Sequence, residues 1–173
     1  MHRALPALLL PRRWNLSDFR LCGLIGGFLV SMLPDWVGSY IGIPYEDHGR
    51  GRCGCDCWGL VRMVLAEQRG IELPCYGTEY ASEDDHAAVG AAMSAAQGGW
   101  APVDDGHEQP FDVAQLTLPI RTPAGWRYEP LHVGIVVMPG VLLHVERATA
   151  ALLAKYRDGA PMQRRLSGFW RRA

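Results

Sequence analysis

The residue with the clearest chemical potential is Cys57, which opens a predicted helix. Apolar residues follow it at helical spacing as far as Leu65. The start of a helix presents unpaired N–H groups and the positive end of the helix dipole, and both favour an anion. A thiol placed there can have its pKa lowered from about 8.5 to between about 3.5 and 7.5, and the thiolate is the nucleophile. Cys57 is therefore a candidate nucleophile, with a buried structural cysteine as the alternative.

Two histidines, His132 and His144, could supply the base that such a nucleophile needs. Both lie in predicted strands that a turn at residues 139–140 would join into a hairpin. The two positions match across that hairpin to within about three residues of register. A general base and the residue that orients it have this kind of arrangement, so the pair is a candidate partner for Cys57.

The secondary structure predicted around these residues indicates an α+β domain. Asp56 is a good N-cap for a helix from Cys57 to Gln68, and Gly70 stands where a helix-ending glycine belongs. A second helix is predicted at residues 83–97. Residues 35–45 are predicted to form a short helical or turn segment, and residues 49–54 are predicted to form a loop. The second half predicts strands at Val113–Leu118, Leu131–Met138, Val141–Val145 and Arg164–Arg171. Residues 104–108 are interpreted as a solvated, charged loop.

Composition limits the possible function classes. The chain has 173 residues and a net charge of -1, so we expect one domain, and nucleic acid is not an expected partner because its binders normally have a basic excess. An odd count of 5 cysteines favours reduced thiols over a disulfide framework. A regulatory disulfide from Cys57 to Cys53 or Cys55 stays open as an alternative. The alternation of these three cysteines is poor for a zinc site, even with His48 nearby.

The N-terminal segment, residues 1–31, is predicted to lie outside the working domain, which we place at residues 32–173. Its apolar run from Leu21 to Leu33 would extend only about 20 Å as a helix, against a hydrocarbon core of about 30 Å, so no stable membrane span is expected. Three interpretations stay open: an extension upstream of a true start at Met32, an export signal, and an ordinary helix.

Several short motifs resemble the NlpC-type cell-wall cysteine peptidases, a papain-like family. The D-C-W-G-L-V sequence at residues 56–61 resembles that family's D-C-S-G-L-V nucleophile motif, and H-V-G-I at 132–135 resembles its base strand. I-P-Y at 43–45 is similar to its upstream element, and His144 stands where it has a third polar residue. The resemblance runs from about residue 36 to residue 169. G-I-E-L-P at 70–74 and R-L-S-G-F at 165–169 are most similar to the tail-associated branch of phages, prophages and gene transfer agents.

The resemblance implies a papain-like NlpC fold, in which the nucleophile-bearing helix packs on a small antiparallel sheet. It implies hydrolysis of a peptide bond in peptidoglycan stem peptides, commonly the D-γ-glutamyl–diaminopimelate bond, with Cys57 as nucleophile, His132 as base and His144 as the orienting residue. The Cys57 N–H and the Tyr45 hydroxyl would stabilise the oxyanion. No metal and no organic cofactor are implied.

Two nearby positions have less certain roles. Asp56 keeps the acidic residue of the family but could serve only as the helix cap. Trp58 replaces a serine that helps to read a free amine on the substrate, and an indole cannot replace that hydroxyl. We therefore expect this protein to share the family's peptide-bond cleavage, and to share its recognition of the free amine to a lesser degree.

The implied partners are peptidoglycan and phage-like tail proteins. We expect the protein to be made in the cytoplasm and carried in a phage-like tail to the periplasm and cell wall, with export by an N-terminal signal as the alternative. Two other functions stay open: a non-catalytic tail-tip assembly protein, and a papain-like acyltransferase that uses the same cysteine and histidine.

Overall fold

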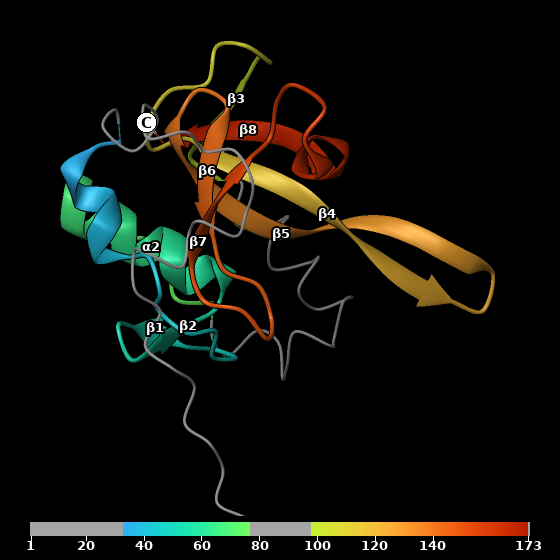
Figure 1. Cartoon of the computed structure of the whole chain (residues 1–173), viewed down its shortest axis with the longest axis horizontal. Helices are drawn as coiled ribbons and strands as arrows, with labels where there is room; N and C mark the ends of the chain where they lie inside the picture. The colour runs from blue at the N-terminus through green and yellow to red at the C-terminus, as the bar shows by residue number, and fades with distance from the viewer. Residues whose placement is uncertain (1–32, 77–97, 173) are drawn as a thin grey trace, which may run out of the picture. The chain divides into compact units, whose positions relative to one another are not determined.

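The computed structural model describes residues 33–76 and 98–172. Within these ranges the chain forms one α-helix, two 3-10 helices and eight strands (Figure 1). The helical elements are η2 (Asp35–Ser39), α2 (Cys57–Arg69) and η3 (Pro161–Arg165). The strands are β1 (Arg50–Gly51), β2 (Gly54–Cys55), β3 (Trp100–Val103), β4 (Val113–Thr122), β5 (Gly125–Met138), β6 (Val141–His144), β7 (Leu152–Lys155) and β8 (Leu166–Arg172).

Six of the strands form an antiparallel sheet in the order β3-β8-β4-β5-β6-β7. The predicted α+β class, with a helix packed on an antiparallel sheet, is confirmed. The four predicted strands correspond to β4, β5, β6 and β8, whereas β3 and β7 were missed. The predicted loop at residues 49–54 instead contains the two-stranded β1-β2 ladder. The predicted helix at 83–97 lies outside the described residues.

Local signals explain why α2 forms where it does. The Asp56 side chain accepts a hydrogen bond from the Gly59 N–H, and Gly70 ends the helix in the left-handed region at φ 64°. The observed helix is one residue longer than the predicted one. Its apolar side chains, with those of η2, β5 and β6, form the larger of two buried clusters. Consequently α2 packs on β5, the strand that carries His132.

The β4–β5 hairpin is much longer than the sequence predicted. The two strands stay paired from Val113–Ile135 out to Thr122–Gly125, with one irregularity near Leu116. The outer half projects beyond the rest of the sheet (Figure 1). Trp126 is 68% exposed and Tyr128 67% exposed on this projecting arm. Apolar residues alternate along both strands of the arm, but the pairing sets Leu118 and Ile120 opposite Glu129 and Arg127. None of residues 117–130 is buried, so the arm presents no core-facing side.

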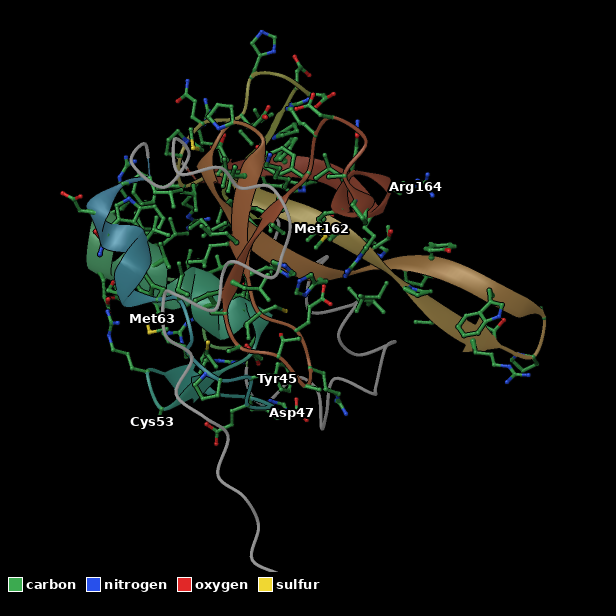
Figure 2. All side chains as sticks on the ribbon, viewed as in Figure 1. Tyr45, Asp47, Cys53, Met63, Met162 and Arg164 are labelled. Atoms are coloured by element: carbon green, nitrogen blue, oxygen red, sulfur yellow. The ribbon has the colours of Figure 1, made fainter. Side chains whose placement is uncertain are left out.

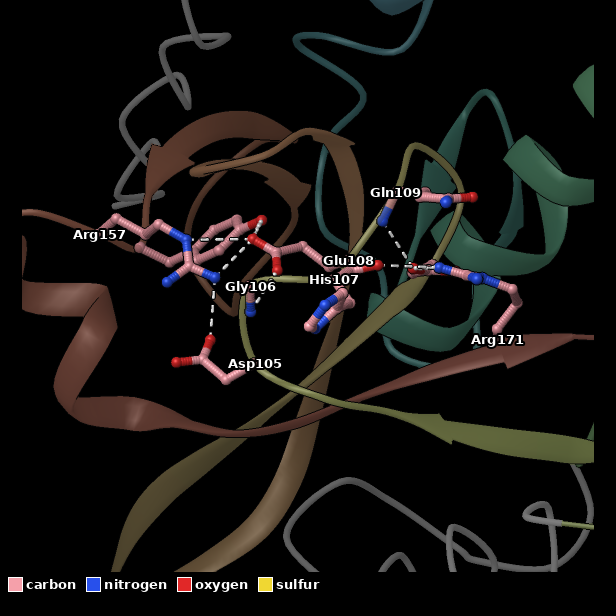
Figure 3. Close-up of polar contacts among 9 residues, drawn as sticks. Asp105, Gly106, His107, Glu108, Gln109, Arg157 and Arg171 are labelled. Carbon is pink, nitrogen blue, oxygen red and sulfur yellow. Dashed lines mark hydrogen bonds and ion pairs between the residues drawn. The ribbon is translucent and has the colours of Figure 1, made fainter.

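A second polar cluster corrects the interpretation of residues 104–108. Asp104 to His107 are exposed as expected, but Glu108 is buried. Its carboxylate accepts hydrogen bonds from the Tyr156 hydroxyl at 3.0 Å and from Arg157 at 2.7 Å (Figure 3). Burial would raise the pKa of Glu108, but these bonds outweigh burial and hold that pKa below its usual range. This loop is therefore fixed to the sheet by a buried ion pair.

Candidate active site

Cys57 is the first residue of α2 and is 7% exposed. Immediately before it, the buried Asp56 carboxylate accepts the Gly59 N–H at 2.6 Å. The cap fixes the first turn, so the Cys57 side chain has a defined position at the positive end of the helix dipole. Cys57 also belongs to the same buried cluster as Val133, the residue after His132.

The negative charge of Asp56 is compensated by Arg50. The guanidinium group forms an ion pair with the carboxylate and also donates to the Gly49 carbonyl at 2.8 Å and the Cys75 carbonyl at 3.2 Å. An isolated carboxylate beside Cys57 would disfavour a thiolate, because like charges repel. The ion pair reduces that penalty. Asp56 thus acts as a helix cap that is neutralised by a neighbour.

The other cysteines near Cys57 have different surroundings. Cys55 is fully buried, and burial, together with the neighbouring Asp56 charge, raises the pKa of its thiol to about 12. Cys53 and Cys75 are exposed, and Cys53 lies at the rim of β1-β2 (Figure 2). The four described cysteines form no disulfide with one another in this structure. Burial makes Cys55 a poor nucleophile.

The two histidines meet across the β5–β6 hairpin. The Nε2 atom of His132 lies 3.1 Å from the Nδ1 atom of His144, and both side chains are buried. The pairing Ile135–Leu143 places Gly134 opposite His144, so His132 is its diagonal neighbour on the same face. A Cβ atom on Gly134 would lie 3.2 Å from the Cβ atom of His144. Gly134 therefore leaves the space that the His144 side chain needs.

The environment of the pair favours neutral imidazoles. Burial lowers the pKa of His132 well below its usual value, and the charges of His144 and Arg165 lower it further. Burial also lowers the pKa of His144, and Arg165 does the same, whereas Glu146 raises it. In a neutral pair one ring donates its N–H and the other accepts it. A neutral His132 whose Nε2 donates would have a lone pair at Nδ1, as a general base requires.

Sequence reasoning missed two residues that complete this cluster, Glu146 and Arg165. The Oε1 atom of Glu146 lies 3.6 Å from Nε2 of His132, 3.5 Å from Nδ1 of His144 and 2.6 Å from Nη1 of Arg165. The signal for Glu146 was its position two residues after His144, where the two side chains of an extended segment share a face. No local signal links Arg165 to the histidines, since it comes from η3.

His132, His144 and Glu146 bring their ligand atoms within 4.8 Å of one another, and no other trio of potential metal ligands in residues 33–76 and 98–172 does so. A cation there would have to displace the guanidinium group of Arg165 from Glu146 and break the bond between the two rings. The arrangement therefore suits a hydrogen-bonded imidazole pair better than metal binding.

Tyr45 lies beside the strand that leads into α2. Its backbone N–H donates to the Thr149 carbonyl at 3.0 Å, and it forms a β-bridge with Cys55, two residues before Cys57. The Tyr45 hydroxyl lies 3.5 Å from a carboxylate oxygen of Asp47 (Figure 2). At this length the contact restrains the hydroxyl only weakly. The backbone of Tyr45 is thus fixed next to the start of α2.

Trp58 is turned toward the segment that follows α2. Its indole N–H donates to the Pro74 carbonyl at 3.0 Å, and its ring lies 5.7 Å from that of Tyr76. The indole therefore fastens residues 74–76 to the first turn of the helix. This contact gives Trp58 a structural role at the position where the similar family has a serine.

The structure brings His132 and His144 together and sets Asp56, Cys57 and Trp58 in sequence at the start of α2. The two groups are carried by elements that pack on each other. In chemical terms, the arrangement offers a thiol at a helix N-terminus and a buried imidazole pair on the adjoining β5–β6 hairpin. These are the components of nucleophilic catalysis by a cysteine.

Comparison with known proteins identifies the part of the chain around Cys57. The model of the NlpC/P60 family matches residues 42–99, about a third of the chain. This segment includes Tyr45, Asp56, Cys57 and Trp58 and ends before His132 and His144. Residues 42–99 are therefore similar to the NlpC/P60 family. No curated protein matches the chain.

Solved structures of the same family resemble the chain at low identity. One is an NLP/P60 family protein similar to a lipoprotein from Staphylococcus aureus, at 19% identity and a TM-score of 0.49, covering 76% of this chain and 37% of that one. Another is the NlpC/p60 domain of the peptidoglycan hydrolase SagA, at 20% identity and a TM-score of 0.43, covering 77% of this chain and 89% of that one. A third is an NlpC/P60 family protein from Bacillus cereus, at 17% identity and a TM-score of 0.49, covering 76% of this chain and 36% of that one. The chain thus spans little more than a third of the first and third proteins.

Proposed function

We propose that the chain is an NlpC/P60-type cysteine hydrolase that cleaves a peptide bond in peptidoglycan stem peptides. The observation that carries the proposal is the buried His132–His144 hydrogen bond on a strand packed against the helix that Cys57 opens. The family match around Cys57 supports it. We propose the D-γ-glutamyl–diaminopimelate bond as the substrate, on the resemblance of residues 56–61 and 132–135 to the cell-wall peptidases.

The proposed reaction begins with proton transfer from Cys57 to His132. Because Nε2 of His132 is engaged with His144, Nδ1 is the nitrogen that would accept this proton. The thiolate attacks the carbonyl carbon, and the imidazolium returns its proton to the leaving amine as the carbon–nitrogen bond breaks. Water, activated by the same imidazole, then hydrolyses the thioester and restores the thiol. A positioned base of this kind contributes about 10²–10⁴-fold to the rate.

We assign the remaining site residues by their surroundings. The N–H of Cys57 and the hydroxyl of Tyr45 are the proposed donors to the tetrahedral oxyanion, each worth roughly 3–4 kcal/mol in well-formed sites. Asp56 holds the helix start and does not enter the reaction. With its N–H donated to Pro74, Trp58 is proposed to limit the recognition of a free amine.

We further propose that the enzyme acts as a tail-associated cell-wall endopeptidase. Support comes from the resemblance of residues 70–74 and 165–169 to the tail-associated branch. In this account, a phage-like tail carries the protein to the cell wall. Export by an N-terminal signal is the alternative route. Among the described residues, no helix has the length and apolar character that crossing a bilayer needs.

Product analysis tests the proposed reaction. Purified wild-type protein, Cys57→Ser and the control Cys53→Ser are each incubated with purified peptidoglycan, and the fragments are identified by mass spectrometry. The proposal predicts new diaminopimelate amines and D-glutamyl carboxylates from the wild type and the control, and none from Cys57→Ser. An amide or ester formed with an added acceptor would indicate an acyltransferase. No new fragments from the wild type would contradict the proposal.

A further inference from the structure

The Glu146 carboxylate lies close to both rings of the histidine pair. Its Oε1 atom lies almost equally far from the two nitrogens that share the ring–ring hydrogen bond, at 3.6 Å from His132 and 3.5 Å from His144. A negative charge in this position interacts with a proton on either nitrogen. It therefore favours the imidazolium form of the pair whichever ring carries the charge.

Arg165 holds the carboxylate in that position. Its Nη1 atom lies 2.6 Å from Oε1 of Glu146, and its Nε–H donates to the Thr117 carbonyl at 3.1 Å. The Thr117 hydroxyl in turn donates to the Arg165 carbonyl at 3.2 Å. Since Thr117 belongs to β4, the guanidinium group is tied to the sheet beside β5. An anchored cation restricts the rotation of the carboxylate.

The charge balance around the pair shows why a carboxylate matters there. The charged groups that act on the two rings are Glu146, after β6, and Arg165, from η3. Helix α2, which packs on β5, begins at Cys57. Burial and Arg165 both oppose protonation of the imidazoles. The Glu146 carboxylate favours it, because it raises the pKa of His144 and lies 3.6 Å from Nε2 of His132.

We infer that Glu146, anchored by Arg165, is a positioning residue that stabilises the imidazolium formed on His132 when Cys57 transfers its proton. The inference rests on the proposed function, since it concerns the same proton transfer. The proton moves from Sγ of Cys57 to Nδ1 of His132, the Nε2–H of His132 stays hydrogen-bonded to His144, and Glu146 neither gains nor loses a proton in this step. The carboxylate acts through the histidines and does not touch the substrate.

Two substitutions that remove charges of opposite sign test this role. Glu146→Gln should lower kcat about tenfold with KM nearly unchanged, and should move the acid limb of the kcat/KM profile to lower pH by about half to one unit. Arg165→Gln should move the same limb to higher pH. Glu146→Asp keeps the charge and should restore the wild-type limb. Loss of folding would not produce shifts of opposite sign.

Glu129 provides a matched control. Its side chain is 29% exposed, against 31% for Glu146, and it forms an ion pair with Arg127 on the projecting hairpin. Glu129→Gln removes one charge and one ion pair without touching the histidines, so kcat and the acid limb should keep their wild-type values. The inference is overturned if Glu146→Gln behaves like Glu129→Gln, or if both charge variants shift the limb in one direction.

A second readout separates this inference from the proposed function. The pKa values of the two histidines are measured by NMR of the ¹⁵N-labelled imidazoles in the full-length protein and in both charge variants. Opposite shifts in the two variants support the arrangement even if the wild type fails to cleave peptidoglycan, which would overturn only the proposed function. Histidine pKa values that do not move overturn the inference, whatever the activity.

Discussion

The Nε2 atom of His132 lies 3.1 Å from the Nδ1 atom of His144, and both rings are buried on one face of the β5–β6 hairpin. A hydrogen bond between two neutral imidazoles couples their tautomers, because one ring must donate and the other must accept. When Nε2 of His132 donates, its Nδ1 has the lone pair of a base, and burial of the pair gives the site a pH dependence of its own.

The stability of the fold should decrease between pH 7.5 and 5.5. Burial lowers the pKa of both histidines in the folded state below the unfolded value of about 6.5. Their contribution is thus complete above about pH 6.5 and is lost as the pH falls toward the folded values, by about 1.4 kcal/mol per pH unit for each histidine that takes up a proton only on unfolding. Urea denaturation at several pH values measures it. A flat profile, or an equal slope in the His132→Gln/His144→Gln double variant, would contradict the assignment.

Gly134→Ala should impair catalysis and stability together. The new Cβ atom would lie 3.1 Å from Leu142 Cδ1 and 3.2 Å from His144 Cβ, so the histidine has to move. Crowding of this kind costs about 1–3 kcal/mol. Gly168→Ala on β8 is the control, since a Cβ atom there meets nothing within 4 Å. Thermal denaturation and kcat are measured on both variants, and equal effects at the two glycines would refute the proposed role of Gly134.

Arg157→Met should destabilise the fold by about 2–4 kcal/mol at pH 7, because it leaves the buried Glu108 carboxylate without its cation. The loss should shrink as the pH falls, because protonation of Glu108 in the variant removes the buried charge that lacks its cation. The pKa of Glu108 is lowered in the wild type, so this contribution is present above about pH 4.3 and is lost as the pH falls. Arg127→Met on the hairpin removes an exposed pair and should cost less than about 1 kcal/mol. Similar losses in both variants would count against a buried ion pair.

Recognition of the substrate amine should be weak. The serine that reads this amine in the similar peptidases is Trp58 here, and its N–H is donated to Pro74. Stem peptides with a free and with an acetylated N-terminal amine should therefore be cleaved at rates within about threefold, equivalent to about 0.7 kcal/mol. Competition between the two peptides, followed by mass spectrometry, gives the ratio. A preference of a hundredfold or more for the free amine would show that the pocket is intact.

Local signals made the helix and the hairpin predictable. The Asp56 cap, the apolar stripe and Gly70 define α2 almost to the residue, because capping and periodicity act within a few positions. The turn predicted at residues 139–140 placed His132 and His144 near each other on paired strands, with the strand register uncertain by about three residues. In the structure, an irregularity between Val136 and Met138 sets that register.

Tertiary pairing decides what the sequence could not show. Arg165 reaches Glu146 only because β8 pairs with β4 and thereby brings η3 beside β4 and β7. Glu108 is buried because Arg157, 49 residues later, returns to it. The apolar residues of β7 became a strand by pairing with β6, not by any pattern of their own. Such contacts join distant parts of the chain, so short-range patterns carry no information about them.

Selective alkylation tests whether Cys57 is the nucleophile. The full-length protein is treated with iodoacetamide at pH 6.5, and modification of each cysteine, followed by peptide mass spectrometry, is compared with the remaining activity. Although Cys57 is only 7% exposed, it should react faster than the exposed Cys53 and Cys75, and activity should fall in proportion to its modification. Slower reaction of Cys57 than of the exposed thiols, or activity that survives its complete alkylation, would contradict a nucleophilic Cys57.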